Sequence, residues 1–72
     1  MTYRAYVIVP EPSQQPDGRW AVAADIRRGT GEQLRQERFI AEDGISYLLE
    51  IEAVKESVNL AKNLIDRGLV GF

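Results

Sequence analysis

The chain has 72 residues and a formal charge of −2, and it contains neither cysteine nor histidine. Disulfides, the usual zinc sites and the histidine-based catalytic triads are therefore excluded. A chain of this length makes one domain, residues 1–72, near the lower size limit for a self-sufficient core, so a partner often supplies further stability. Residues 1–40 hold six arginines against five acids, and residues 41–72 hold three bases against six acids, so neither half predicts a polyanion-binding surface by charge alone.

The first predicted element is a strand over residues 3–9, which are β-branched and aromatic and are followed by Pro10 and Pro12. Both faces of this strand carry apolar side chains. The segment Pro10–Gly18 holds all three prolines of the chain and ends in Asp17-Gly18. It predicts a long polar connection of the hairpin type.

The second strand shows the clearest alternation in the sequence. One face carries Trp20, Val22, Ala24 and Ile26, and the other carries Arg19, Ala21, Ala23, Asp25 and Arg27. Gly29-Thr30-Gly31 then predicts a second tight hairpin, because glycine adopts the positive φ that such turns need. The return strand, about Gln33–Ile40, is mostly polar and is predicted to be an edge strand protected by its charges.

The last element is an amphipathic helix that begins between Tyr47 and Glu50 and ends at Arg67, with Gly68 as the stop signal. Residues Ala41–Ser46 before it are a predicted loop. The apolar half of the helix comprises Ile51, Ala53, Val54, Ser57, Val58, Leu60, Ala61, Leu64 and Ile65. The element order predicts an α+β fold, βββα, in which a three-stranded antiparallel meander is followed by one helix packed on one sheet face.

Parts of this pattern resemble known families. The strand Tyr6-Val7-Ile8-Val9, the restart Asp17-Gly18-Arg19-Trp20-Ala21-Val22, and the helix residues Glu52-Ala53 and Ala61 resemble the HicB-type partial ribonuclease-H-like module of bacterial antitoxins. The Pro-Asp-Leu-Pro-Gly type signature of that family is absent, because Asp25 is followed by Ile26-Arg27-Arg28. The chain is also similar to small uncharacterised βββα proteins of bacterial and prophage genomes in Phe39, Gly44, Tyr47, Glu52-Ala53 and Ala61-Lys62-x-x-Ile65-Asp66. The first resemblance implies an antitoxin-like regulatory domain, and the second implies no activity.

The sheet face that the helix leaves uncovered is the strongest functional hint, because its apolar side chains must meet solvent, the C-terminal tail or another chain. Depending on which face the helix covers, these side chains are Tyr6 and Ile8, or Tyr3, Val7 and Val9. We expect a two-fold symmetric homodimer, or alternatively a monomer in which the tail covers the face. The predicted interface residues are Tyr6, Ile8, Ala21 and Ala23, the two alanines being small enough for close approach.

Four arginines, Arg27, Arg28, Arg35 and Arg38, are the best candidates for contact with an anion or a nucleic acid, since the hairpin brings them into one neighbourhood. Asp25, Glu32 and Glu37 lie among them and could instead pair with them across the strands.

Catalysis is not expected, because the five serines and threonines have no histidine to activate them. The two lysines are predicted to lie on the solvent-facing side of the helix, where a depressed pKa is not expected. We expect no cofactor and no metal, since the acids are scattered. No leader and no membrane-spanning segment is indicated, which predicts a cytoplasmic protein. The sequence thus predicts a non-enzymatic protein-interaction module, homodimeric through the uncovered face, with an unidentified protein as a further potential partner. The alternative is a nucleic-acid-binding or regulatory, antitoxin-like domain that uses the four arginines.

Overall fold

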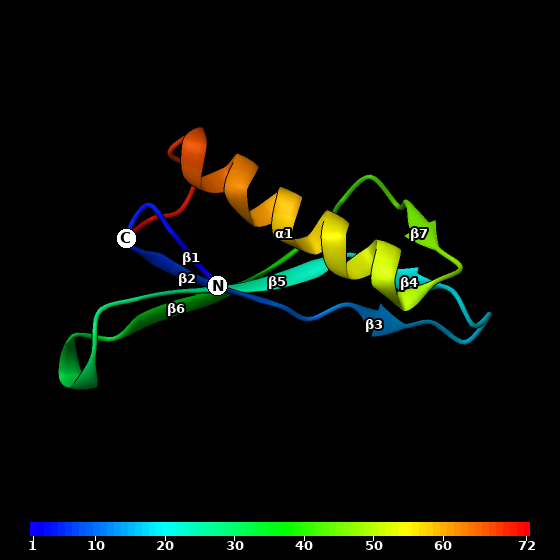
Figure 1. Ribbon diagram of the computed structural model, residues 1–72, viewed down its shortest axis with the longest axis horizontal. Helices are drawn as coiled ribbons and strands as arrows, with labels where there is room; N and C mark the ends of the chain where they lie inside the picture. The colour runs from blue at the N-terminus through cyan, green and yellow to red at the C-terminus, as the bar shows by residue number, and fades with distance from the viewer.

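Seven short strands form two antiparallel sheets, and one C-terminal helix packs on them in the computed structural model, which describes residues 1–72 (Figure 1). The larger sheet has the order β1-β2-β5-β6. Its strands are β1 (Thr2–Tyr3), β2 (Tyr6–Pro10), β5 (Ala23–Arg28) and β6 (Arg35–Ile40). The smaller sheet, β3-β4-β7, comprises Ser13–Gln14, Trp20–Ala21 and Ser46–Tyr47. A 3-10 turn, η1 (Gly31–Gln33), joins β5 to β6, and α1 spans Glu50–Asp66. The α+β class and the C-terminal helix are confirmed, whereas a simple three-stranded meander is wrong.

The first predicted strand folds back into β1 and β2, and the second breaks into β4 and β5. The other two extra strands were not predicted: β3 lies within the predicted connection Pro10–Gly18, and β7 begins at the end of the predicted loop Ala41–Ser46. β2 and β3 are separated around Pro12, which has no N–H for a sheet ladder. Two backbone hydrogen bonds bridge the breaks: the Glu11 N–H donates to Ala23 O (2.9 Å) and the Ala41 N–H donates to Val22 O (3.0 Å). The smaller sheet therefore continues the hairpins of the larger one.

The N-terminal strand is shorter than predicted, because the chain reverses at Arg4 and Ala5. Both residues have positive φ, +48° and +67°, and Tyr3 pairs with Tyr6, which makes a two-residue hairpin turn. Turns of this kind normally contain glycine or asparagine, so the sequence carries no local signal for it. Tertiary contacts hold it instead, since Arg4 Nε lies 2.7 Å from Asp66 Oδ1 on α1.

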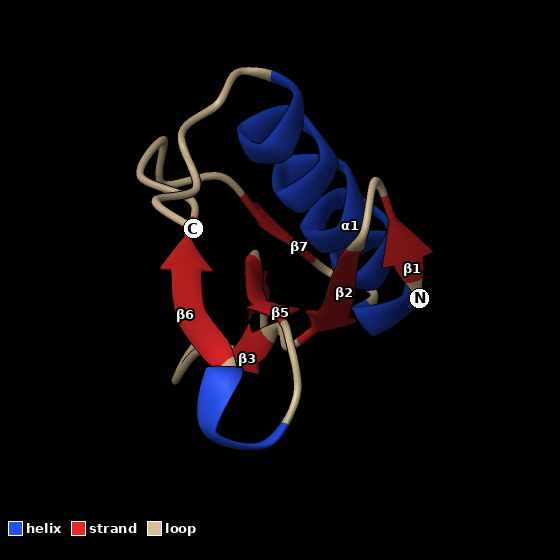
Figure 2. Cartoon of the chain, turned by 90° about the vertical axis from the view of Figure 1, so that its left-hand side faces the viewer, coloured by secondary structure: helices blue, strands red, loops and turns tan.

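The hydrophobic core lies between α1 and the central strands. Ile8 and Ile26 stand opposite each other on β2 and β5, and both are completely buried. Figure 2 shows α1 on one side of β2, β5 and β6. The helix meets the sheets through Ala53, Ser57 and Ala61, small residues spaced by one turn that allow close approach. The core cluster is Ile8, Ala24, Ile26, Ala61 and Val70, with Tyr3, Tyr6, Phe39, Leu64, Ile65 and Phe72 packed around it.

The C-terminal tail also folds onto this covered side. Val70 is buried and Phe72 is half-buried, and the Tyr6 hydroxyl donates to Phe72 O. The tail thus completes the core beside α1. The monomer alternative required the tail to cover the opposite sheet face, and the tail does not do so.

Candidate interaction surfaces

The residues predicted to form a dimer interface lie mostly inside the fold. Ile8 and Ala23 are 0% and 1% exposed, so neither presents a surface to a partner. Tyr6 is half-buried on the helix side, and Ala21 is half-buried in β4. The placement of Tyr6 and Ile8 on the uncovered face is wrong, because the register that pairs Ile8 with Ile26 turns both toward the helix.

The uncovered face, called here the open face, carries the other residues of the three long strands. They are Val7 and Val9 of β2, Ala23, Asp25 and Arg27 of β5, and Gln36, Arg38 and Ile40 of β6. Arg27 Nε forms an ion pair with Asp25, which is only 6% exposed. Arg38 reaches across β5 and donates from Nη2 to Glu11 O (3.2 Å). Polar groups that contact one another therefore occupy the middle of the open face. Exposed apolar side chains remain only at its margins, in Val7 and Ile40.

The four arginines of the hairpin do not form a single surface. Arg28 stands opposite Arg35, Asp25 stands opposite Arg38, and Arg27 stands opposite Gln36. Because alternate residues of a strand face opposite sides, Arg27 and Arg38 lie on the open face and Arg28 and Arg35 on the helix side. The prediction that all four share one neighbourhood is wrong, since it overlooked this alternation.

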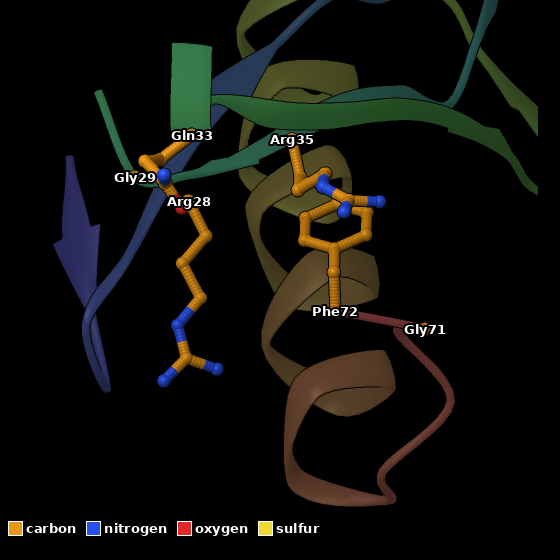
Figure 3. Close-up of a pocket in the computed structure, with 6 residues that line it drawn as sticks. All are labelled: Arg28, Gly29, Gln33, Arg35, Gly71 and Phe72. Carbon is orange, nitrogen blue, oxygen red and sulfur yellow. The ribbon is translucent and has the colours of Figure 1, made fainter. Parts of the chain in front are cut away.

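Arg28 and Arg35 line a pocket of about 460 Å³ near the turn of the hairpin (Figure 3). The six lining residues are Arg28, Gly29, Gln33, Arg35, Gly71 and Phe72. Arg28 Nη1 donates to the Tyr6 hydroxyl (3.1 Å), and the Arg28 guanidinium carbon lies 5.0 Å from the centre of the Tyr6 ring. Neither arginine forms an ion pair with a carboxylate.

The largest concentration of exposed apolar side chains lies where β7 leads into α1, at the end of the molecule remote from both termini (Figure 1). Ile45, Leu48, Leu49 and Ile51, called here the apolar patch, are between 53% and 71% exposed. The patch is anchored by β7 and by Arg19, whose Nε donates to Ser46 Oγ (2.9 Å) and whose Nη2 donates to Ser46 O (2.7 Å).

Three carboxylates act on Tyr47, which lies between Ile45 and Leu48 of the apolar patch. Partial burial raises the pKa of Tyr47 above its ordinary value, and the carboxylates of Glu56, Asp43 and Glu52 raise it further. None of these three acids forms an ion pair with a basic side chain. The apolar patch therefore has a negative rim of acids that form no ion pair, next to the Arg19 guanidinium group, which contacts Ser46.

The raised pKa of Tyr47 predicts a loss of stability in alkali. Since the folded chain holds the phenol proton more tightly than the unfolded chain, this contribution is fully present below the unfolded pKa of about 10 and disappears as pH rises through the folded value. The variant Tyr47→Phe should lose less stability than the wild type as pH rises above about 10, measured by urea unfolding. An equal loss in both proteins would contradict the assignment.

The sequence pattern does not indicate the apolar patch. It assigns Ile51 to the buried half of the helix, whereas the helix meets the sheets through Ala53, Ser57 and Ala61 and leaves Ile51 exposed. One available signal was Leu49, which occupies the N-cap of α1 and makes no capping hydrogen bond. Serine, threonine, aspartate and asparagine are the residues that normally cap a helix, so leucine there is unexpected.

No family model matches this chain, and neither a curated protein nor a solved structure is similar to it. The resemblance to HicB-type modules and to prophage βββα proteins therefore stays a prediction. No group of three acidic, cysteine or histidine side chains is arranged to hold a metal ion, and α1 lacks the length and apolar character needed to cross a membrane.

Proposed function

We propose that this chain is a non-enzymatic protein-interaction module that binds its partner through the apolar patch. The observation that carries the proposal is the exposure of Ile45, Leu48, Leu49 and Ile51, four large aliphatic side chains within seven residues. Exposed apolar side chains are common singly, but a contiguous group with a polar rim is typical of a protein-binding site.

The N-cap of α1 supports this proposal. Leu49 has the extended backbone of an N-cap residue but offers no oxygen to the free N–H groups of the first turn. A serine at this position would stabilise the helix by about 1 kcal/mol. The leucine therefore lowers the stability of the isolated chain, and contact with a partner accounts for its presence.

The charge of the rim indicates the chemistry of the partner. Asp43, Glu52 and Glu56 surround Tyr47, and Glu50 lies in the first turn of α1. In a two-fold dimer through this patch, the acids of one copy would approach those of the other, and such like-charge contacts are unfavourable. A segment of another protein with apolar side chains and flanking basic residues fits the surface best.

The test uses two synthetic amphipathic helical peptides that differ only in charge, one built from leucine and lysine and the other from leucine and glutamate. The chain should bind the lysine peptide in a saturable manner and the glutamate peptide at least about ten-fold more weakly. Leu48→Ser and Leu49→Ser should each weaken binding of the lysine peptide at least about ten-fold, as expected for central residues of an interface. Fluorescence anisotropy of the labelled peptide measures both effects.

Leu69→Ser is the matched control, because Leu69 is equally exposed but follows the far end of α1. It should leave peptide affinity unchanged. Leu49→Ser should also raise the urea midpoint while it lowers affinity, a combination that a purely structural role for Leu49 would not produce. Equal weakening by Leu69→Ser, or equal binding of the two peptides, would contradict the proposal.

Homodimerisation through the open face is the second candidate, and the exposure of Val7 and Ile40 at its margins favours it. The Arg27–Asp25 pair and the Arg38 contact to Glu11 oppose it, because a partner would have to desolvate them. Light scattering separates the candidates. If the partner is a different protein, the isolated chain should be a monomer with a mass of 8.1 kDa. A dimer that Ile40→Glu dissociates and Leu48→Ser does not would establish the open face as the interface.

A further inference from the structure

We infer that the pocket between Arg28 and Arg35 binds the doubly charged phosphate group of a small phosphomonoester. This site is independent of the apolar patch. It lies at the turn of the β5–β6 hairpin, whereas the patch lies at the opposite end of the molecule beside β7 (Figure 1).

The pocket is lined by two positively charged side chains. Arg28 and Arg35 stand directly opposite each other on neighbouring antiparallel strands, a position in which like charges repel. The other two arginines of the hairpin, Arg27 and Arg38, each contact an acid, but these two form no ion pair. Arg28 is linked to the C-terminal Phe72 only through the Tyr6 hydroxyl. Two guanidinium groups without an ion-pair partner match the charge of a phosphate monoester, which is close to −2 at neutral pH. Their planar forks also suit bidentate contact with phosphate oxygens.

A glycine that the turn requires and a pair of side-chain hydrogen bonds hold the wall of the pocket in place. Gly29 has φ +88°, and a Cβ atom there would lie 2.5 Å from Gln33 O, so the turn requires glycine. The Tyr6 hydroxyl accepts a hydrogen bond from Arg28 and donates one to Phe72 O, which ties one arginine to the C-terminal tail. Figure 3 shows the Arg28 side chain extended to one side of Phe72, with its guanidinium group separated in this view from that of Arg35, which overlaps the Phe72 ring.

The size and lining of the pocket indicate a ligand larger than phosphate alone. Its volume of about 460 Å³ lies within the range of small-molecule sites. The Phe72 ring is its one large apolar wall, and Gln33 and the two arginines supply polar groups. An organic group that carries the phosphate can therefore pack against Phe72 while the phosphate contacts the guanidinium groups.

A nucleic acid fits this site less well. A polynucleotide needs a series of basic contacts along its backbone. Here Arg27 and Arg38 lie on the other side of the sheet, and Glu37 shares the Arg35 side of β6. One phosphate group, rather than a row of them, matches what the hairpin presents.

The test is a titration of the ¹⁵N-labelled chain at low salt, followed by backbone amide chemical shifts. Phenyl phosphate is the probe, with benzoate as the singly charged comparison and inorganic phosphate as the comparison without a ring. Phenyl phosphate should cause saturable shifts confined to residues 28–35 and 71–72. Benzoate and inorganic phosphate should each bind at least about ten-fold more weakly.

Arg28→Gln and Arg35→Gln should each weaken phenyl phosphate binding at least about ten-fold. Arg67→Gln is the matched control, because Arg67 is exposed, forms no ion pair and follows α1 outside the pocket; it should change nothing. If inorganic phosphate bound as tightly as phenyl phosphate, the proposal of a phosphomonoester ligand would be wrong, and the pocket would be a site for free phosphate. Shifts spread over all basic residues, or shifts that survive Arg35→Gln, would overturn the site itself.

Discussion

Replacing Ile8 by alanine should lower the free energy of unfolding by about 3 kcal/mol, the typical cost of truncating a fully buried aliphatic side chain. Ile8 is completely buried against Ile26, Ala61 and Val70, and the small residues of α1 cannot move in to fill the space. A domain of 72 residues has a total stability of roughly 4–11 kcal/mol. The substitution should therefore remove a large part of the stability, measured by urea unfolding followed by circular dichroism.

Val7→Ala is the matched control, since Val7 is the residue before Ile8 in β2 and faces the other way. It should cost less than about 1 kcal/mol, because Val7 is already 42% exposed. The pair of variants tests which sheet face the helix covers. A larger loss for Val7→Ala than for Ile8→Ala would place α1 on the opposite face.

Replacing Ser57 by alanine should lower the free energy of unfolding by about 1–2 kcal/mol, although alanine is the better helix former. Ser57 is completely buried, and its Oγ donates to Ala53 O (2.7 Å) and accepts the Ala23 N–H (3.2 Å). That N–H lies at the break between β4 and β5. Alanine would leave this buried donor without a partner, and an unsatisfied buried N–H is costly.

Asn59→Ala provides the comparison on the same helix. Asn59 is exposed, and its amide makes only a long contact with Glu56 (3.5 Å). This substitution should leave stability unchanged or raise it slightly through helix propensity. If Ser57→Ala proved as stable as the wild type, the hydrogen bond to the β4–β5 break would contribute nothing to folding.

The N-terminal strand shows why the local sequence pattern did not predict where the strands of the sheets begin and end. Residues 3–9 have strong β character, but the chain reverses at Arg4 and Ala5, which lack the glycine or asparagine of such turns. At this reversal Arg4 forms an ion pair with Asp66, 62 positions away in the sequence. Contacts at that separation leave no trace in a short window of sequence.

The candidate sites illustrate a similar limit. The sequence marked Arg28 and Arg35 as candidates for anion contact but grouped them with Arg27 and Arg38, which the strand alternation puts on the other face. The apolar patch was overlooked because Ile51 fits the apolar half of an ideal helix. Ile51 lies about 200° around the helix from Ala53, so it points away from the side on which Ala53, Ser57 and Ala61 meet the sheets.

By itself the sequence determined the types of the main elements, the turn at Gly29 and the position of the C-terminal helix up to Gly68, since these depend on local propensity and on glycine backbone freedom. Only the tertiary structure decided which sheet face the helix covers, which arginines share a pocket and which aliphatic side chains stay exposed. Both faces of β2 carry apolar side chains, so either could have met the helix, and a register shift of one residue would exchange them. Packing between distant segments made that choice.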